Sequence, residues 1–370
     1  MFGWFIIILL FSFLSLLFKN EKSRFIWFIL ACIGGFRFNI GTDFHQYVII
    51  YNQIIMSPYL YPIEPGYKIL VVASDTIGGN PQLVFLFTSI LTMYFLYKGF
   101  CYYLLDLKLK SYSYIVICCL FFVLYFYVLT SVRQALALSI FFYSSKYIIQ
   151  KKFYKFSLAL LLSSMFHTSV IFFLPLYFFA NKKYSNIKVL FFLIFCVILV
   201  FVDTLPIFGS VTSALNLKYA RYFMSDFYTT GEGNQGSVEL TLISITLLSF
   251  IYFIIKKETS SYIFIANMIL VFIFLRVLAL DMDVVNRLSN YIKPFMIVFI
   301  VISVRSLVVQ FPNAKNLIVF ISFLFFLIIN SAYLYFSNES FAHLTFNLKI
   351  FGEGNSLFNV IGNYDLFWMK

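Results

Sequence analysis

Residues 151–183 read KKFYKFSLALLLSSMFHTSVIFFLPLYFFANKK, an apolar run that begins and ends with a pair of lysines. Basic residues beside membrane helices mark the cytoplasmic side, so a single crossing would put one pair on the wrong side. Two short arms, 154–166 and 168–180, would keep both pairs together. Each arm is about 20 Å long, which is short for a full span. The stretch therefore predicts a short or re-entrant helical hairpin with His167 at its turn.

The rest of the chain repeats this alternation of apolar runs and basic residues. Of the 370 residues, 62% are hydrophobic and 11% are charged. Helices satisfy their backbone hydrogen bonds inside lipid, whereas a β-barrel would show alternating segments of about ten residues. We predict an all-α polytopic membrane protein of about 11–12 transmembrane helices. The other apolar runs are 2–18, 25–40, 81–105, 112–130, 134–150, 187–205, 238–255, 261–280, 290–309 and 316–336.

The basic residues also predict the orientation of the chain. They are scattered in twos and threes between the runs, which fits a topology signal and not a nucleic-acid surface, despite the net charge of +12. If they are cytoplasmic, the segments 37–80, 206–237 and 337–370 lie outside. We expect one integral domain over 1–370, in the inner (cytoplasmic) membrane of a bacterium, and we predict no cofactor and no metal.

Several charged side chains fall on the predicted outer face. Arginine on the side that the positive-inside rule disfavours needs a reason, and a guanidinium binds phosphate through two parallel hydrogen bonds. A cavity lined by such groups would suit a pyrophosphate carried at the membrane surface. The outer residues are Arg37, Asp43, Glu64, Arg133, Gln134, Arg221, Asp281, Asp283 and Arg287.

Each of these residues also has a purely structural interpretation. Arg133 could snorkel or pair with a loop carboxylate, and the i,i+4 spacing of Asp283 and Arg287 suits a helical ion pair. Asp281 and Asp283 form a DxD pattern that can bind metal but is common by chance. His167 could be a satisfied core residue or, as a neutral imidazole at the turn of the hairpin, a general base.

Short motifs follow one another along the chain in a distinctive order: Arg37–Tyr47 (RFNIGTDFHQY), Glu64–Tyr67 (EPGY), Ser131–Ala137 (SVRQALA), Phe166–Ser169 (FHTS) followed by Pro175, Arg221–Tyr222, and Asn286–Tyr291 (NRLSNY). This order and spacing resembles the EpsG family, which comprises Wzy-type exopolysaccharide and O-antigen polymerases. The resemblance covers residues 35–295.

The resemblance implies a GT-C-like glycosyltransferase. Its donor and acceptor would be oligosaccharides on undecaprenyl pyrophosphate, and a chain-length regulator protein and membrane lipid would be its further partners. The growing glycan would be transferred to a new lipid-linked repeat unit, with Arg133 and Arg287 at the pyrophosphate and His167 as base. Asp43 and Glu64 are competing bases or orienting groups. Substrate-binding roles are implied for Arg37, Asp43, Glu64, Gln134, Arg221 and Tyr222.

Other functions fit part of the same pattern. A lipid-sugar flippase would place charges near mid-membrane, often in repeated halves, and the sequence has no visible repeat. An O-antigen ligase would share the arginines and the base. A membrane acyltransferase would use a histidine with an acyl-donor site. Only the motif order favours the polymerase over the ligase, whereas the placement of the charges mainly at one face also argues against the flippase.

Overall fold

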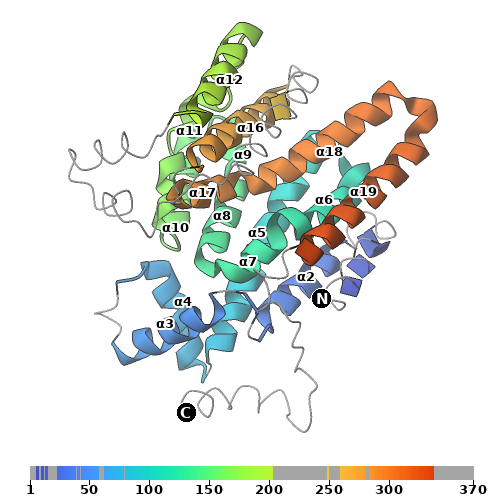
Figure 1. Ribbon diagram of the computed structural model, residues 1–370. Helices are drawn as coiled ribbons and strands as arrows, with labels where there is room; N and C mark the ends of the chain where they lie inside the picture. The colour runs from blue at the N-terminus through green and yellow to red at the C-terminus, as the bar shows by residue number, and fades with distance from the viewer. Residues whose placement is uncertain are drawn as a thin grey trace.

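The computed structural model describes residues 6–7, 10–11, 13–15, 23–38, 40–41, 43–57, 62–78, 80–202, 248–249, 259–280 and 283–336. These residues form helices and connecting turns, with no strand among them (Figure 1). The predicted all-α polytopic class is therefore confirmed. The predictions for Arg221, Tyr222 and Asp281, and for the segments 206–237 and 337–370, concern residues outside those described.

The helices have the following bounds. They are α2 (Ser23–Gly35), α3 (Phe44–Met56), α4 (Pro65–Thr76), α5 (Pro81–Asp106), α6 (Ser113–Leu120), α7 (Phe126–Thr130), α8 (Val132–Ser144), α9 (Lys146–Ile149), α10 (Phe153–Ser164), α11 (Leu176–Phe179), α12 (Asn186–Val200), α16 (Ser260–Leu278), α17 (Asp283–Ser289), α18 (Lys293–Gln310) and α19 (Lys315–Phe336). Short turns are η2 (Lys110–Tyr112), η3 (Phe121–Tyr125), η4 (Thr168–Phe173), η5 (Asn290–Ile292) and η6 (Pro312–Ala314).

Three stretches in the described part of the chain are long and apolar enough to cross a membrane. They are Pro81–Asp106, Ser260–Leu278 and Val285–Gln310. Lys110–Leu120 and Val123–Thr130 meet at 57° and would make a fourth crossing if the bent pair is one span and not a re-entrant loop. The sequence predicted one run over 112–130, but the π-helical turn η3 interrupts it, and π segments commonly change the direction of a helix. The total of 11–12 helices remains a prediction.

The predicted hairpin is present. Helix α10 ends at Ser164, the backbone at His167 is extended, and a second arm runs through η4 to Phe179. The open ends of the two arms meet, because the ring of Phe153 lies 4.9 Å from that of Tyr177. The turn at His167 is therefore at the opposite end from both lysine pairs, as the charge pattern required.

Helix α5 runs through the middle of the bundle, with α2 and α8 packed along it (Figure 1). Its start is fixed by Asn80, whose side chain accepts a hydrogen bond from the backbone N–H of Gln82 at 2.9 Å, and by Pro81 in the first turn. Helix α2 can approach α5 closely because Gly34 and Gly35 have no Cβ. A Cβ at either position would collide with Ser89 or Leu86 of α5.

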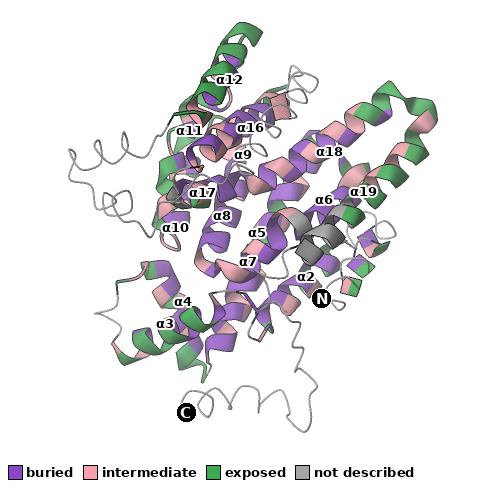
Figure 2. Ribbon diagram, in the orientation of Figure 1, coloured by how far each residue is buried: buried purple, intermediate pink, exposed green. Residues whose placement is uncertain are grey.

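The predicted outer segment 37–80 is not an open loop, since it contains α3 and α4 packed against each other and against α5. At the other end of the molecule from α3 and α4, much of α12 is coloured as exposed in Figure 2. Its exposed residues include the large apolar Phe191, Phe195 and Ile198. An apolar exposed face of this extent is expected of a helix that contacts lipid. Helices α3 and α4 thus lie at one end of the bundle and α12 lies at the other (Figure 1).

Candidate active site

Three residues from distant parts of the sequence meet at the start of α4. Glu64 is the residue before Pro65, has an extended backbone and makes no capping hydrogen bond with its side chain. One carboxylate oxygen forms an ion pair with the Arg133 guanidinium. The other lies 3.2 Å from Nδ1 of His167. The structure therefore brings together the EPGY, RQ and FH motifs in one contact.

The backbone holds α4 and the hairpin turn together at the same place. The N–H of Gly66 donates a hydrogen bond to the carbonyl of Met165 at 2.8 Å. A Cβ on Gly66 would lie 2.8 Å from that same carbonyl oxygen, well inside van der Waals contact. Glycine at 66 thus permits the close approach that sets the distance between Glu64 and His167.

Arg133 is held by aromatic rings as well as by Glu64. Its guanidinium carbon lies 5.9 Å from the ring centres of both Tyr47 and Tyr67, within the range of a cation–π interaction. Tyr67 is buried, and Tyr47 is 6% exposed. The arginine at the start of α8 is consequently fixed in one orientation by α3 and α4 together.

The electrostatics keep Glu64 ionised. Burial by itself would raise its pKa, but the hydrogen bond from His167 and the positive charge of Arg133 together lower the pKa to about 2. A carboxylate with so low a pKa is a weak base at neutral pH. Of the two carboxyl groups predicted as competing bases, Glu64 is therefore better suited to orienting a neighbour than to taking a proton.

The contact with Glu64 also sets the chemistry of His167. With its Nδ1 facing a carboxylate, the neutral imidazole carries its proton on Nδ1 and donates it to Glu64. The lone pair is then on Nε2, which is free to accept a proton from another group. The His167 side chain is 25% exposed, against 10% for Glu64, so the imidazole is the more accessible of the two.

Gln134 and Arg287 form a second contact between helices. The Gln134 side chain donates a hydrogen bond to the Arg287 carbonyl at 2.6 Å, which ties α8 to α17. The Arg287 side chain itself is exposed. Nearby, the Ser169 and Tyr291 hydroxyls are 3.0 Å apart, which joins the hairpin to η5. The segment from α17 to η5 therefore borders the group formed by Glu64, Arg133 and His167, which we call the Glu64 cluster.

Arg37 and Asp43, also predicted as substrate-binding, lie in a different setting. Arg37 is only 4% exposed, donates a hydrogen bond to the Gly34 carbonyl at 2.8 Å and stacks 4.5 Å from the Phe85 ring centre. Asp43 is half-buried at the start of α3, one turn before Tyr47. Arg37 therefore packs against Phe85 of α5, and Asp43 immediately precedes the first turn of α3.

Two cations on this side of the bundle were missed by the sequence analysis. Arg276, near the end of α16, donates a hydrogen bond to the Asn286 side chain at 2.8 Å. Lys293, at the start of α18, has its Nζ 5.0 Å from the Tyr127 ring centre. Both are basic residues inside predicted apolar runs, 261–280 and 290–309. That placement is costly in a membrane and is the signal that could have identified them.

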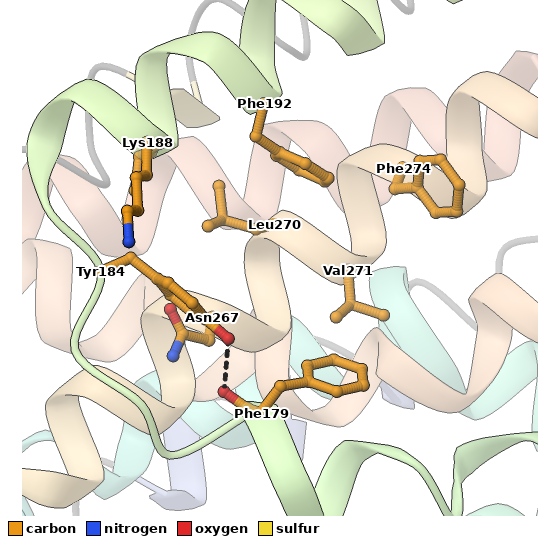
Figure 3. Close-up of a pocket in the computed structure, with 9 residues that line it drawn as sticks. Phe179, Tyr184, Lys188, Phe192, Asn267, Leu270, Val271 and Phe274 are labelled. Carbon is orange, nitrogen blue, oxygen red and sulfur yellow. Dashed lines mark hydrogen bonds between the residues drawn. The ribbon is translucent and has the colours of Figure 1, made fainter.

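A cavity of about 500 Å³ lies elsewhere, between α12 and α16 (Figure 3). Its walls are apolar except for a few groups such as Lys188 and the Tyr184 hydroxyl, which donates to the Phe179 carbonyl at 3.1 Å. Glu64, Arg133 and His167 are not among its lining residues. The cavity has no carboxylate in its described lining, so it lacks the acid–base groups of the Glu64 cluster.

The resemblance in motif order agrees with a comparison to known families, in which residues 23–348 match the EpsG family. The chain belongs to the EpsG family. No curated protein and no solved structure that we compared matched it. Membership of the EpsG family, with the long apolar helices, supports a polysaccharide polymerase-type function in a membrane and lipid-linked polysaccharide substrates.

Proposed function

We propose that this EpsG-family protein is a Wzy-type glycosyltransferase that polymerises lipid-linked repeat units. It would transfer the growing glycan from undecaprenyl pyrophosphate to a new lipid-linked unit on the periplasmic face of the inner membrane. The observation that carries the proposal is the contact of His167 with Glu64, beside Arg133. This arrangement provides an oriented base next to a fixed positive charge, which is what a displacement at an anomeric carbon requires.

His167 is the proposed general base. Its Nε2 accepts the proton of the acceptor hydroxyl while the hydroxyl oxygen forms a bond to the anomeric carbon of the donor. The bond from that carbon to the pyrophosphate oxygen breaks, and undecaprenyl pyrophosphate leaves with the electron pair. Glu64 holds the imidazole in the required tautomer and stabilises the imidazolium that forms, as the carboxylate of a histidine–carboxylate pair does.

Arg133 has a different proposed role from the one that the motif resemblance implied. Its charge is already balanced by Glu64, so we propose that it positions the carboxylate and the rings around it. Arg287 and Gln134, on the adjoining helices, remain proposed substrate contacts, with the exposed guanidinium of Arg287 available to an anion. Arg221 and Tyr222 remain substrate-binding predictions from their motif, and no metal is needed if cationic side chains stabilise the leaving group.

The proposal is tested by complementing a deletion strain and separating its surface glycan on a gel. Wild-type protein should restore a ladder, and His167→Ala should leave single repeat units at normal membrane levels of protein. His45→Ala, a matched change at an exposed histidine on α3, should restore the ladder. A normal ladder from His167→Ala would overturn the assignment of the base. Loss of all surface glycan in the deletion strain would indicate a flippase or a ligase instead.

A further inference from the structure

Arg276 and Lys293 are basic groups that the Glu64 cluster does not use. Both side chains are half-buried, one near the end of α16 and one at the start of α18. Among the side chains that the structure describes, neither has a carboxylate within ion-pair distance. A half-buried charge without a counter-ion is costly, particularly within an apolar span. Two such charges on contacting helices, neither paired with a described carboxylate, therefore need an explanation.

The contacts of the two cations show that they face the same region. Arg276 is held by Asn286 on α17, and Lys293 follows directly after η5. Both positive charges therefore border the same short segment, α17 to η5, and like charges in one region repel each other. Repulsion of this kind is relieved when an anion binds between like charges. If the two side chains served only to pack helices together, neutral residues at both positions would be more stable, because they carry no cost of burying a charge.

The surrounding groups suit a ligand with several oxygen atoms. The Tyr127 hydroxyl is buried and makes no hydrogen bond of good geometry within the described part of the chain. Asn286 and Asn290 supply side-chain amides on α17 and η5, and Asn290 is 8% exposed. Donors of this type complete the coordination of a phosphate group whose charge is met by lysine and arginine.

The cations are also connected to the proposed catalytic residues. Tyr291, next to Asn290, is within hydrogen-bonding distance of Ser169, two residues after His167. The carbonyl of Arg287, next to Asn286, accepts a hydrogen bond from Gln134, the neighbour of Arg133. An anion held by Arg276 and Lys293 would therefore lie along the α17–η5 segment, which borders the Glu64 cluster.

We propose that Arg276 and Lys293 form a binding site for a diphosphate group, with Tyr127 and Asn290 as additional donors. This inference rests on the proposed function, in which the group is the diphosphate end of a polyprenyl lipid donor. Two positive charges match a diphosphate better than a monophosphate, and they would stabilise it most as it leaves with its full charge. Arg133, which is already paired with Glu64, is not required for this binding.

The test is direct binding of farnesyl diphosphate to the purified full-length protein in detergent. Lys293→Met and Arg276→Gln should each weaken binding roughly 10-fold or more, because each removes a charge-assisted hydrogen bond. Lys293→Arg should retain most of the affinity. Lys315→Met, the matched change at an exposed lysine at the start of α19, should leave the affinity unaltered. A monodisperse gel-filtration peak for each variant excludes misfolding.

Competitors identify the ligand group. Inorganic pyrophosphate should displace the probe, farnesyl monophosphate should compete less well, and phosphatidylglycerol vesicles should not compete. Unchanged affinity in both Lys293→Met and Arg276→Gln, or equal competition by phosphatidylglycerol, would overturn the diphosphate site. His167→Ala should bind the probe normally while producing no ladder, so a failure of this inference is distinguishable from a failure of the proposed reaction.

Discussion

Arg133 and the Arg276–Lys293 pair are basic groups on neighbouring parts of one bundle, and they differ in what balances their charge. Arg133 faces the carboxylate of Glu64 and two tyrosine rings. Arg276 donates to the side-chain oxygen of Asn286 and Lys293 lies over the ring of Tyr127, with no carboxylate beside them in the described structure. The comparison suggests that a balanced cation positions other groups, whereas an unbalanced one is available to an anionic ligand.

The largest expected difference between the two regions is in stability. Glu64→Gln would leave the partly buried charge of Arg133 without its counter-ion, which should lower the free energy of unfolding by about 2 kcal/mol. Lys293→Met would replace an unbalanced charge with an apolar side chain of similar length, so stability should be unchanged or higher. Thermal unfolding of both variants in detergent measures this. Equal destabilisation by the two changes would contradict the distinction between the regions.

A second prediction concerns the close approach at Gly66. In Gly66→Ala the new methyl group would push α4 away from the Met165 carbonyl, at a cost of about 1–3 kcal/mol. The Glu64–His167 contact should lengthen and polymerisation should fall, while farnesyl diphosphate binding at Arg276 and Lys293 should persist. The matched control is Ile69→Ala, at an exposed position of α4. A fully active Gly66→Ala protein would show that this spacing is unimportant.

A third prediction concerns the acid side of the pH–stability profile. The pKa of Glu64 is lowered from 4.5 to about 2, so its ionised form stabilises the fold above pH 4.5. That contribution should be lost progressively as the pH falls from 4.5 toward 2. Unfolding temperatures measured across this window should decline less steeply for Glu64→Gln than for the wild type. Parallel declines would show that the carboxylate is not specifically stabilised.

Part of this arrangement could be predicted from the sequence. Lysine pairs at both ends of one apolar run fixed the hairpin, because a single crossing conflicted with the positive-inside rule. The contact of Glu64 with Arg133 could not be predicted by spacing alone. That contact depends on α3 and α4 packing onto α5. The distribution of basic residues predicted only that the segment 37–80 lies outside, not that it folds into these two helices.

Other features were missed for physical reasons that can be named. The bend between α6 and α7 arises from a π-helical turn, and the hydrophobic pattern of 112–130 is the same for a straight helix. Arg276 is the only charged residue of the run 261–280, and Lys293 is separated from Arg305, the other basic residue of the run 290–309, by eleven residues; neither therefore forms a basic cluster that would indicate topology. The energetic cost of placing a charged side chain inside a membrane span was the signal that could have identified them.

The central claim is that Glu64 acts through His167, and a double-mutant cycle tests it most directly. Initial rates of polymerisation are measured in vitro for the wild type, Glu64→Gln, His167→Ala and the double variant. Glu64→Gln alone should lower the rate roughly 100-fold or more, which is within the range for loss of a general base. In the His167→Ala background the same change should lower the rate by less than about 3-fold, because the two residues act as one unit. An equal loss in both backgrounds would contradict the account.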